Sequence, residues 1–139
     1  QLLTNVDALR VTDAQAWIVK PACEGSSVGL FKAENSQQLI AAVERSLQET
    51  EEVLVETFIE GIECTVSIVD GKVMPVVSIK PASELYDYQA KYQSNSTQYQ
   101  CPADVPEAWQ LKLQADALKA YQALHLSAWC RIEPKKKIK

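Results

Sequence analysis

Short apolar runs separated by turn residues are typical of β-strands, and they fill much of the first half of this chain. Runs at residues 17–19, 28–33, 53–55, 64–69 and 73–79 predict five strands. Pro21 follows the first run and is expected to end that strand, because proline fixes φ and has no N–H to donate. Asp70-Gly71, between the last two runs, predicts a tight hairpin turn.

Two longer segments have apolar residues at helical spacing instead. Ser36 is expected to cap a helix over residues 37–49, and Asp104 with Glu107 resembles a capping box that begins a helix over residues 106–124. A last strand is predicted over residues 128–132. The side chains expected to face inward are Leu39, Ile40, Val43 and Leu47 in the first helix, and Trp109, Leu111, Leu113, Ala117, Leu118, Tyr121 and Leu124 in the second.

Three segments show no clear period. Residues 1–14 are interpreted as a connector. Residues 81–103 are predicted to form a long loop that contains four tyrosines, and long ordered loops often close over functional sites. After Pro134 the pattern ends in lysines, which predicts a disordered basic end.

The alternation of hairpins with two amphipathic helices predicts an α+β fold of two small subdomains, each made of antiparallel strands and a helix. We expect a small subdomain over residues 1–62, part of a larger one over 63–133, and a basic tail over 134–139. The chain has 139 residues, 47% hydrophobic and 23% charged. This composition is typical of a globular protein.

Charge and composition exclude several function classes. Four of the 14 basic residues lie in the tail, so residues 1–134 carry ten basic against 18 acidic side chains, a net charge of −8. An acidic body argues against a nucleic-acid partner. No apolar run approaches the ~20 residues that span a bilayer, and no signal segment begins the chain, so we expect a cytoplasmic protein without a membrane partner. The four cysteines form no C-x-x-C pair, which favours free thiols over zinc.

A small-residue loop beside a lysine is the strongest candidate for chemistry. Lys20 ends an apolar run, and Gly25, Ser26, Ser27 and Gly29 follow it closely. Small residues let backbone N–H groups approach an anion, hydroxyls add donors, and the lysine supplies a point charge. This combination predicts a phosphate-binding loop, although it lacks the Walker pattern. The alternative is an ordinary Gly/Ser turn between two strands.

Two further clusters fit a nucleotide. Glu56 follows an apolar strand and has the chemistry to accept from an adenine amino group, while backbone groups of residues 57 and 59 read the ring edge. Glu63 is suited to hold ribose hydroxyls. Lys91 and Tyr92 lie in the aromatic loop, where a cation meets phosphate and a phenol closes a pocket. The alternatives are two surface glutamates at a strand end and two side chains on a mobile loop.

Two more polar side chains lie outside these clusters. Arg131, on the last predicted strand, is a candidate for stabilising negative charge that develops during reaction, or else a salt-bridged surface residue. The single histidine, His125, is expected at a helix end and is assigned no chemistry.

Taken together, these segments resemble the ATP-grasp region of the D-alanine–D-alanine ligase family, in order and over residues 16–133. Five motifs in sequence carry the resemblance. They are Val19-Lys20-Pro21 with Glu24-Gly25-Ser26-Ser27-Val28-Gly29, Val53-Leu54-Val55-Glu56 with Gly61-Ile62-Glu63-Cys64-Thr65-Val66, Tyr86-Asp87-Tyr88-Gln89-Ala90-Lys91-Tyr92, Thr97-Gln98-Tyr99 with Cys101-Pro102-Ala103, and Arg131-Ile132.

The resemblance implies an ATP-grasp fold, incomplete at both ends, and assigns residue roles. Lys20 and Lys91 would contact ATP phosphates, and Ser26 would pair with Tyr92 to close two loops over the site. The implied catalytic set is Ser26, Tyr92 and Arg131. The implied nucleotide-binding set is Lys20, Glu24, Ser26, Ser27, Glu56, Thr57, Phe58, Ile59, Glu63 and Lys91.

The resemblance also implies a reaction. In this family a D-alanine carboxylate attacks the γ-phosphate of ATP, and the amine of a second D-alanine displaces phosphate to give a dipeptide for peptidoglycan. Magnesium, or manganese, accompanies ATP, and family members are usually homodimers. The Lys91-Tyr92 pair is similar to that of the dipeptide-forming branch.

The end of the chain departs from the family pattern. Glu133 stands where the family has a metal-binding aspartate, Pro134 and lysines follow, and the later Glu-x-Asn segment with the other metal ligands is absent. We therefore expect a ligase fragment that is inactive in isolation. Two alternatives stay open: a non-catalytic ATP-grasp module that binds adenine nucleotide, and another ATP-grasp carboxylate–amine ligase.

Overall fold

The computed structural model describes residues 1–81, Tyr88, Lys91, Gln93 and residues 96–137. These residues form two compact units. The first unit contains residues 1–59 together with the described residues of the segment 85–93, and the second contains the remaining described residues from 60 onward. The boundary at Ile59–Glu60 lies just before a long strand.

The first unit is a four-stranded antiparallel sheet in the order β1-β4-β2-β3, with one helix. Residues 1–14, interpreted from the sequence as a connector, contribute an edge strand and a short 3-10 helix. The elements are β1 (Leu2–Leu3), η1 (Val6–Ala8), β2 (Trp17–Pro21), β3 (Phe31–Ala33), α1 (Ser36–Leu47) and β4 (Val53–Thr57).

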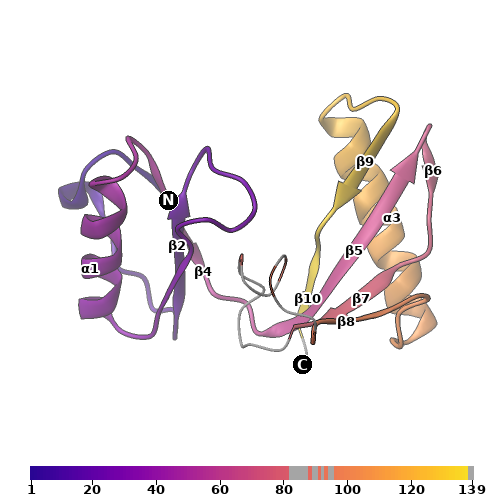
Figure 1. The fold of residues 1–139 in the computed structure, drawn as a ribbon, viewed down its shortest axis with the longest axis horizontal. Helices are drawn as coiled ribbons and strands as arrows, with labels where there is room; N and C mark the ends of the chain where they lie inside the picture. Colours follow the sequence, from indigo (N-terminus) through magenta and orange to yellow (C-terminus); the bar gives the residue numbers. More distant parts are fainter. Residues whose placement is uncertain (82–87, 89–90, 92, 94–95, 138–139) are drawn as a thin grey trace. The chain divides into compact units, whose positions relative to one another are not determined.

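One face of this sheet is buried against α1, which lies alongside β2 and β4 in Figure 1. Successive residues of a strand point to opposite faces, so only every second residue of β2 and β4 enters this core. The core consists of Leu3, Trp17, Val19, Ala33, Leu39, Val43, Val53 and Val55. Of the residues expected to face inward in α1, Ile40 does not: its side chain is 40% exposed.

Helix α1 begins one residue earlier than the sequence pattern predicts. Asn35, not Ser36, is the N-cap: its backbone is extended and its Oδ1 accepts from the Gln38 backbone N–H at 2.9 Å. The Gln38 side chain reaches back and accepts from the Glu34 N–H at 2.8 Å. This reciprocal pair satisfies two N–H groups near the start of the helix, which is why Asn35 takes the cap and Ser36 enters the helix.

Strand β2 also differs from its predicted end. It continues through Pro21, whose Cα lies opposite Val53 in the ladder with β4. Proline is tolerated there because it is the last residue of the strand, where no further donor is needed.

The second unit is built around its longest strand, β5 (Gly61–Val69). All strand pairs in the unit are antiparallel, and the order is β10-β5-β7-β8, with β6 and β9 also paired to β5. The other elements are β6 (Lys72–Val73), β7 (Val77–Lys80), β8 (Gln98–Gln100), α3 (Glu107–Ala123), β9 (Trp129–Ile132) and β10 (Lys135–Lys137).

Helix α3 lies across β5 and covers one face of this sheet (Figure 1). The core between them is Cys64, Val66, Ile68, Val76, Ala103, Leu113 and Ala117. Two residues expected to face inward, Leu111 and Leu124, are instead 61% and 66% exposed. Among the described residues, no helix is both long and apolar enough to cross a bilayer.

The predicted capping box at the start of α3 is wrong. Pro106 is the N-cap and makes no side-chain cap bond. The chain before the helix is held instead by Gln110, whose Nε2 donates to the carbonyls of Ala103 and Val105, each at 3.2 Å. The proline already fixes φ at −50°, so the entry to the helix is set by the backbone rather than by a cap.

The predicted turn at Asp70-Gly71 is confirmed, with φ of 48° and 75° as an Asp-Gly hairpin turn requires. The strand that follows is interrupted: β6 ends at Val73 and β7 begins at Val77. The lysine-rich end also differs from expectation, because Lys135–Lys137 form strand β10 on β5.

Candidate functional site

Each sheet has a face opposite its helix, and the candidate residues lie on these two faces. In the first unit the buried positions of β2 and β4 are 17, 19, 53 and 55, so Lys20 and Glu56 point to the face opposite α1. The two residues are diagonal neighbours in the ladder between β2 and β4. Lys20 Nζ and Glu56 Oε2 are 2.5 Å apart, and both side chains are partly exposed. The structure thus brings together two residues that sequence analysis placed at a nucleotide.

The serine loop, residues 22–30, joins β2 to β3 and begins two residues after Lys20. Ser26 and Ser27 both have φ of 59°, in the left-handed region that non-glycine residues rarely adopt, and Gly29 has φ of 68°. The Val28 N–H donates to the Gly25 carbonyl at 3.2 Å, which closes a turn within the loop. Two consecutive left-handed serines make this loop a candidate ligand-binding loop. Glu24 and Ser26 are exposed and Ser27 is half-buried.

Sequence analysis missed Lys32. Its Cα lies opposite Ile18 on β2, and Ile18 lies opposite Glu56 on β4, so Lys32 and Glu56 share a row on the same face. Lys32 Nζ is 4.7 Å from the centroid of the Phe58 ring and 2.9 Å from Glu34 Oε1. Lys32 therefore makes a cation–π contact with a residue of the predicted adenine segment. The sequence signal that could have found Lys32 is its place between Phe31 and Ala33 in the predicted return strand.

The segment predicted to read adenine is accessible. Glu56, Thr57 and Ile59 are exposed and Phe58 is half-buried. The Phe58 backbone N–H donates to the Ala16 carbonyl at 2.9 Å, which ties the end of β4 to the chain before β2.

In the second unit, one row of side chains crosses four strands. Lys135 of β10 lies opposite Glu63 of β5, Glu63 opposite Ile79 of β7, and Ile79 opposite Tyr99 of β8. Directly opposite residues in antiparallel strands point to the same face, so all four side chains share one face. They line a cavity of about 660 Å³.

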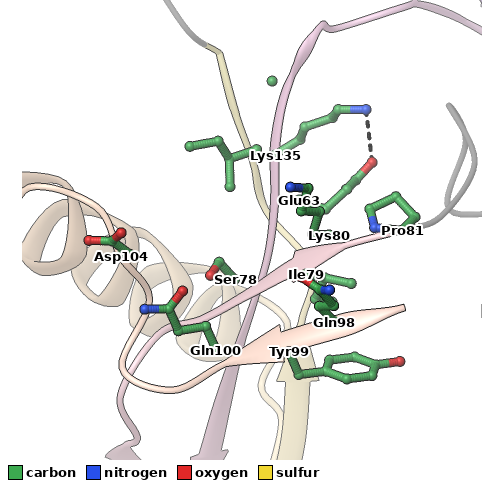
Figure 2. A pocket seen from close by; sticks show the side chains of 12 residues that line it. Glu63, Ser78, Ile79, Lys80, Pro81, Gln98, Tyr99, Gln100, Asp104 and Lys135 are labelled. Carbon is green, nitrogen blue, oxygen red and sulfur yellow. Dashed lines mark ion pairs between the residues drawn. The ribbon is translucent and has the colours of Figure 1, made fainter. Parts of the chain in front are cut away.

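Figure 2 shows the Lys135 and Glu63 side chains turned toward each other in this cavity. Lys135 Nζ is 2.8 Å from Glu63 Oε1, and the two side chains are only 22% and 25% exposed. Sequence analysis proposed Glu63 but missed Lys135, because a run of lysines carries no strand signal. The other residues that line this cavity include Ser78, Lys80, Gln98, Gln100 and Asp104.

Arg131 and Glu133 lie on the same face of this sheet as Glu63. Arg131 is opposite Ser67 of β5, four residues from Glu63, and Arg131 Nη2 is 2.7 Å from Glu133 Oε1. The pair lines a second hollow of about 670 Å³ with Ser67, Val69, Trp129 and Cys130. Both predicted residues are therefore placed together, but in a different hollow from Glu63.

These residues do not fit a divalent cation. In the described part of the chain there is no group of three or more His, Cys, Asp or Glu side chains that could hold a metal ion. Mg²⁺ takes several oxygen ligands, whereas Glu133 is a single carboxylate already engaged by an arginine.

The long tyrosine-containing loop is described only in part. Tyr92 lies outside the described residues, and Lys91 is half-buried in the unit that contains residues 1–59. That Lys20, Glu56, Glu63 and Lys91 bind one nucleotide, as the resemblance implies, stays a prediction, because Glu63 belongs to the other unit.

Cys64, next to Glu63 in β5, has a shifted pKa. Burial raises the pKa of the Cys64 thiol, and the adjacent negative charge of Glu63 raises it further. Both effects disfavour the thiolate, so Cys64 is a core residue rather than a nucleophile. Its side chain points into the core against α3, away from the face that carries Glu63.

Comparison with known proteins identifies relatives over most of the chain. The family model described as "D-ala D-ala ligase C-terminus" matches residues 11–135. A D-alanine–D-alanine ligase of Pseudoalteromonas atlantica is 45% identical over 116 residues, 84% of this chain and 36% of that protein. One from Idiomarina loihiensis is 40% identical over 129 residues, 93% of this chain and 42% of that protein. The chain thus spans about two fifths of the length of these relatives.

Solved structures agree with this assignment. The D-alanine–D-alanine ligase of Bacillus anthracis in complex with ATP superposes with a TM-score of 0.78 at 26% identity, over 99% of this chain and 44% of that one. The VanG D-Ala:D-Ser ligase of Enterococcus faecalis superposes with a TM-score of 0.76 at 29% identity, over 90% and 37%. The predicted α+β fold of ATP-grasp type is confirmed. With the family model matching 125 of its 139 residues, this chain belongs to the D-ala D-ala ligase C-terminus family.

Proposed function

We propose that this chain is the ATP-binding part of a D-alanine–D-alanine ligase, which joins two D-alanines through a D-alanyl phosphate for peptidoglycan synthesis. The observation that carries the proposal is the Lys20–Glu56 pair on one sheet face, directly before a loop with two strained serines. The family membership and the ATP-bound structural relative support the nucleotide assignment.

In this proposal the phosphates bind at the serine loop. Lys20 supplies a positive charge, and Ser26 and Ser27 present hydroxyls and the backbone N–H groups of a turn. Lys91 adds a second cation at the phosphates. Glu24, at the exposed start of the loop, completes the set that sequence analysis assigned to ATP.

The base and the sugar bind at the glutamates. Glu56 accepts from the adenine amino group, and Thr57, Phe58 and Ile59 contact the ring. Glu63 accepts from the ribose hydroxyls, within a cavity whose volume of about 660 Å³ lies in the range of small-molecule sites. Ile79, buried beside Glu63, supplies an apolar floor.

The reacting end of the site depends on closure and positive charge. We propose that Ser26 and Tyr92 pair to close the two loops and exclude water while an acyl phosphate exists. Arg131 stabilises the charge that develops as D-alanine attacks and as the second amine displaces phosphate. Magnesium, or manganese, would neutralise phosphate charge in the whole enzyme, but Glu133 alone does not hold it here.

Two broader expectations come from the family resemblance alone. We propose that the whole enzyme acts in the cytoplasm, where ATP and peptidoglycan precursors are available, and that it assembles as a homodimer.

Calorimetric titration of the purified chain with ATP tests the proposal. We expect Lys20→Ala to weaken ATP binding about tenfold, which corresponds to about 1.4 kcal/mol, because a phosphate loses a charge-assisted hydrogen bond. Lys112→Ala is the matched control: Lys112 lies on α3 and pairs with Asp116, so its loss should leave affinity unchanged. Equal affinities for the two variants, or no ATP binding by the unmodified chain, would overturn the proposal.

A second candidate function is a module that binds adenine nucleotide without turnover. The observation in its favour is that the described residues offer no cluster that could hold a cation, and that Glu133 is paired with Arg131. The two candidates differ in D-alanine-dependent phosphate release, not in ATP affinity.

A further inference from the structure

The Glu63–Lys135 pair carries an inference about how this chain binds nucleotide. It rests on the proposed function, in which Glu63 accepts from the ribose hydroxyls. The two residues are directly opposite in the ladder between β5 and β10, and the ammonium lies 2.8 Å from Glu63 Oε1. Their side chains are about one quarter exposed, so water screens this pair less than it screens a surface ion pair.

An ammonium and a ribose diol make the same demand on a carboxylate. Both donate hydrogen bonds, so the lysine ammonium and the two hydroxyl protons each need an acceptor such as the carboxylate. A diol bound to both carboxylate oxygens uses Oε1, where Lys135 already takes one of the two lone pairs and part of the space around the oxygen. Ribose therefore binds Glu63 only if the ammonium shares or leaves its position.

The backbone of β10 holds Lys135 at this place. The next residue, Lys136, points to the other face and sets its Nζ 4.5 Å from the centroid of the Trp109 ring on α3. Before it, the Pro134 carbonyl accepts from the Cys64 N–H at 3.0 Å. Because both neighbours are anchored, Lys135 can release Glu63 only by rotating its own side chain.

We propose that Lys135 is a built-in competitor of the ribose for Glu63, which lowers the affinity of this chain for ATP and its preference for ribose over a sugar without hydroxyls. Lys135 is thus a specificity-determining residue of the nucleotide site. It acts through its charge and its hydrogen bonds on one carboxylate.

The test compares Lys135→Met with Lys137→Met in the full chain, using ATP and 2′,3′-dideoxy-ATP as ligands. Each variant removes one positive charge from β10, and Lys137 is exposed and lies outside the cavity. Removing a positive charge by itself weakens binding of an anion. The inference predicts the opposite sign for Lys135→Met: ATP binds about two- to fivefold tighter, as expected for the loss of a partly exposed ion pair.

The ligand without sugar hydroxyls separates competition from a general effect. Dideoxy-ATP should bind the Lys135→Met variant no more tightly than the unmodified chain, so the ratio of the two affinities rises only for that variant. Lys135→Gln, which keeps a polar side chain in β10, provides a second substitution if the methionine variant has a lower melting temperature.

Each outcome decides the inference. Tighter ATP binding with unchanged dideoxy-ATP binding supports it. Unchanged or weaker ATP binding by both Lys135 variants contradicts it while leaving the proposed function in place. If neither the unmodified chain nor any of the variants binds ATP, both the proposed function and this inference fail.

Discussion

At the scale of single residues, two of the five described non-glycine residues with positive φ lie in the candidate phosphate loop. Ser26 and Ser27 hold φ of 59°, and left-handed non-glycine residues cost on the order of 1 kcal/mol each. Gly29 in the same loop has no such cost, but a Cβ there would lie 3.1 Å from the Pro21 ring. The sequence motif indicated a loop of small residues, yet composition alone does not tell which residues become left-handed.

The four cysteines lead to a prediction at this scale. Burial and the Glu63 charge raise the pKa of Cys64, whereas Cys23 and Cys101 are exposed. A raised pKa leaves a smaller thiolate fraction at any pH below it, and the thiolate is the reactive form. At pH 8 we expect Ellman's reagent to modify Cys23 and Cys101 rapidly and Cys64 slowly, as read by mass spectrometry of peptides.

Unfolding the chain in guanidinium chloride provides the control, because all thiols should then react at similar rates. Rapid modification of Cys64 in the folded chain would contradict the prediction and the packing of β5 against α3.

At the scale of elements, β9 and β10 act as one interrupted strand along β5. The same register runs through both, from Trp129 opposite Val69 to Lys137 opposite Gly61. The ladder continues across Glu133 and Pro134 without a shift. Gly61 is required at its end, because a Cβ there would overlap the backbone carbonyl of Lys136.

This close approach predicts the effect of Gly61→Ala. The added methyl group must displace backbone rather than a flexible side chain, so we expect the free energy of unfolding to fall by about 1–3 kcal/mol. Urea unfolding followed by circular dichroism measures it. Gly25→Ala is the matched control, since no atom lies within 4 Å of the position of its Cβ, and an equal loss in both variants would refute the argument.

The prediction of helices and strands was correct where one apolar period was clear, and it failed where contacts between distant segments determine the structure. Periodic apolar residues marked both helices and the central strands. Lysines have low strand propensity, so β10 has no local signal and exists because β5 offers a partner. The exposure of Leu111 has a similar origin, because only the face of α3 that meets β5 is buried.

At the scale of the whole molecule, the chain is two sheets that each bury one face under a helix and present candidate residues on the other. The sequence predicted most of these candidate residues, because the spacing of a motif can be recognised without knowledge of the fold. It missed Lys32 and Lys135, whose positions depend on the register between paired strands; for Lys135 these strands are also distant in sequence. Family resemblance supplied the roles themselves, which no periodicity encodes.

A prediction about activity belongs to this scale. We expect the purified 139-residue chain to show no D-alanine-dependent phosphate release from Mg-ATP. Phosphoryl transfer depends on cations that neutralise developing charge, and loss of one such group costs roughly 3 kcal/mol, about a hundredfold in rate. The described residues offer no metal cluster. A malachite green assay checks this, with Lys91→Ala as the control.

Release that requires D-alanine and disappears in Lys91→Ala would overturn this expectation. Release that persists in that variant would instead indicate a contaminating ATPase.

Strand β10 has one more consequence, which concerns association between copies. Within the described sheet order it stands at an edge, and an edge strand presents unpaired N–H and C=O groups that can join the sheet of another chain. Its three lysines place positive charge on both faces of that edge. In two copies that approached edge to edge, Glu63 would neutralise only Lys135, and the charges of Lys136 and Lys137 would still face like charges. The strand that locally competes for a carboxylate therefore also disfavours growth of the sheet into an aggregate.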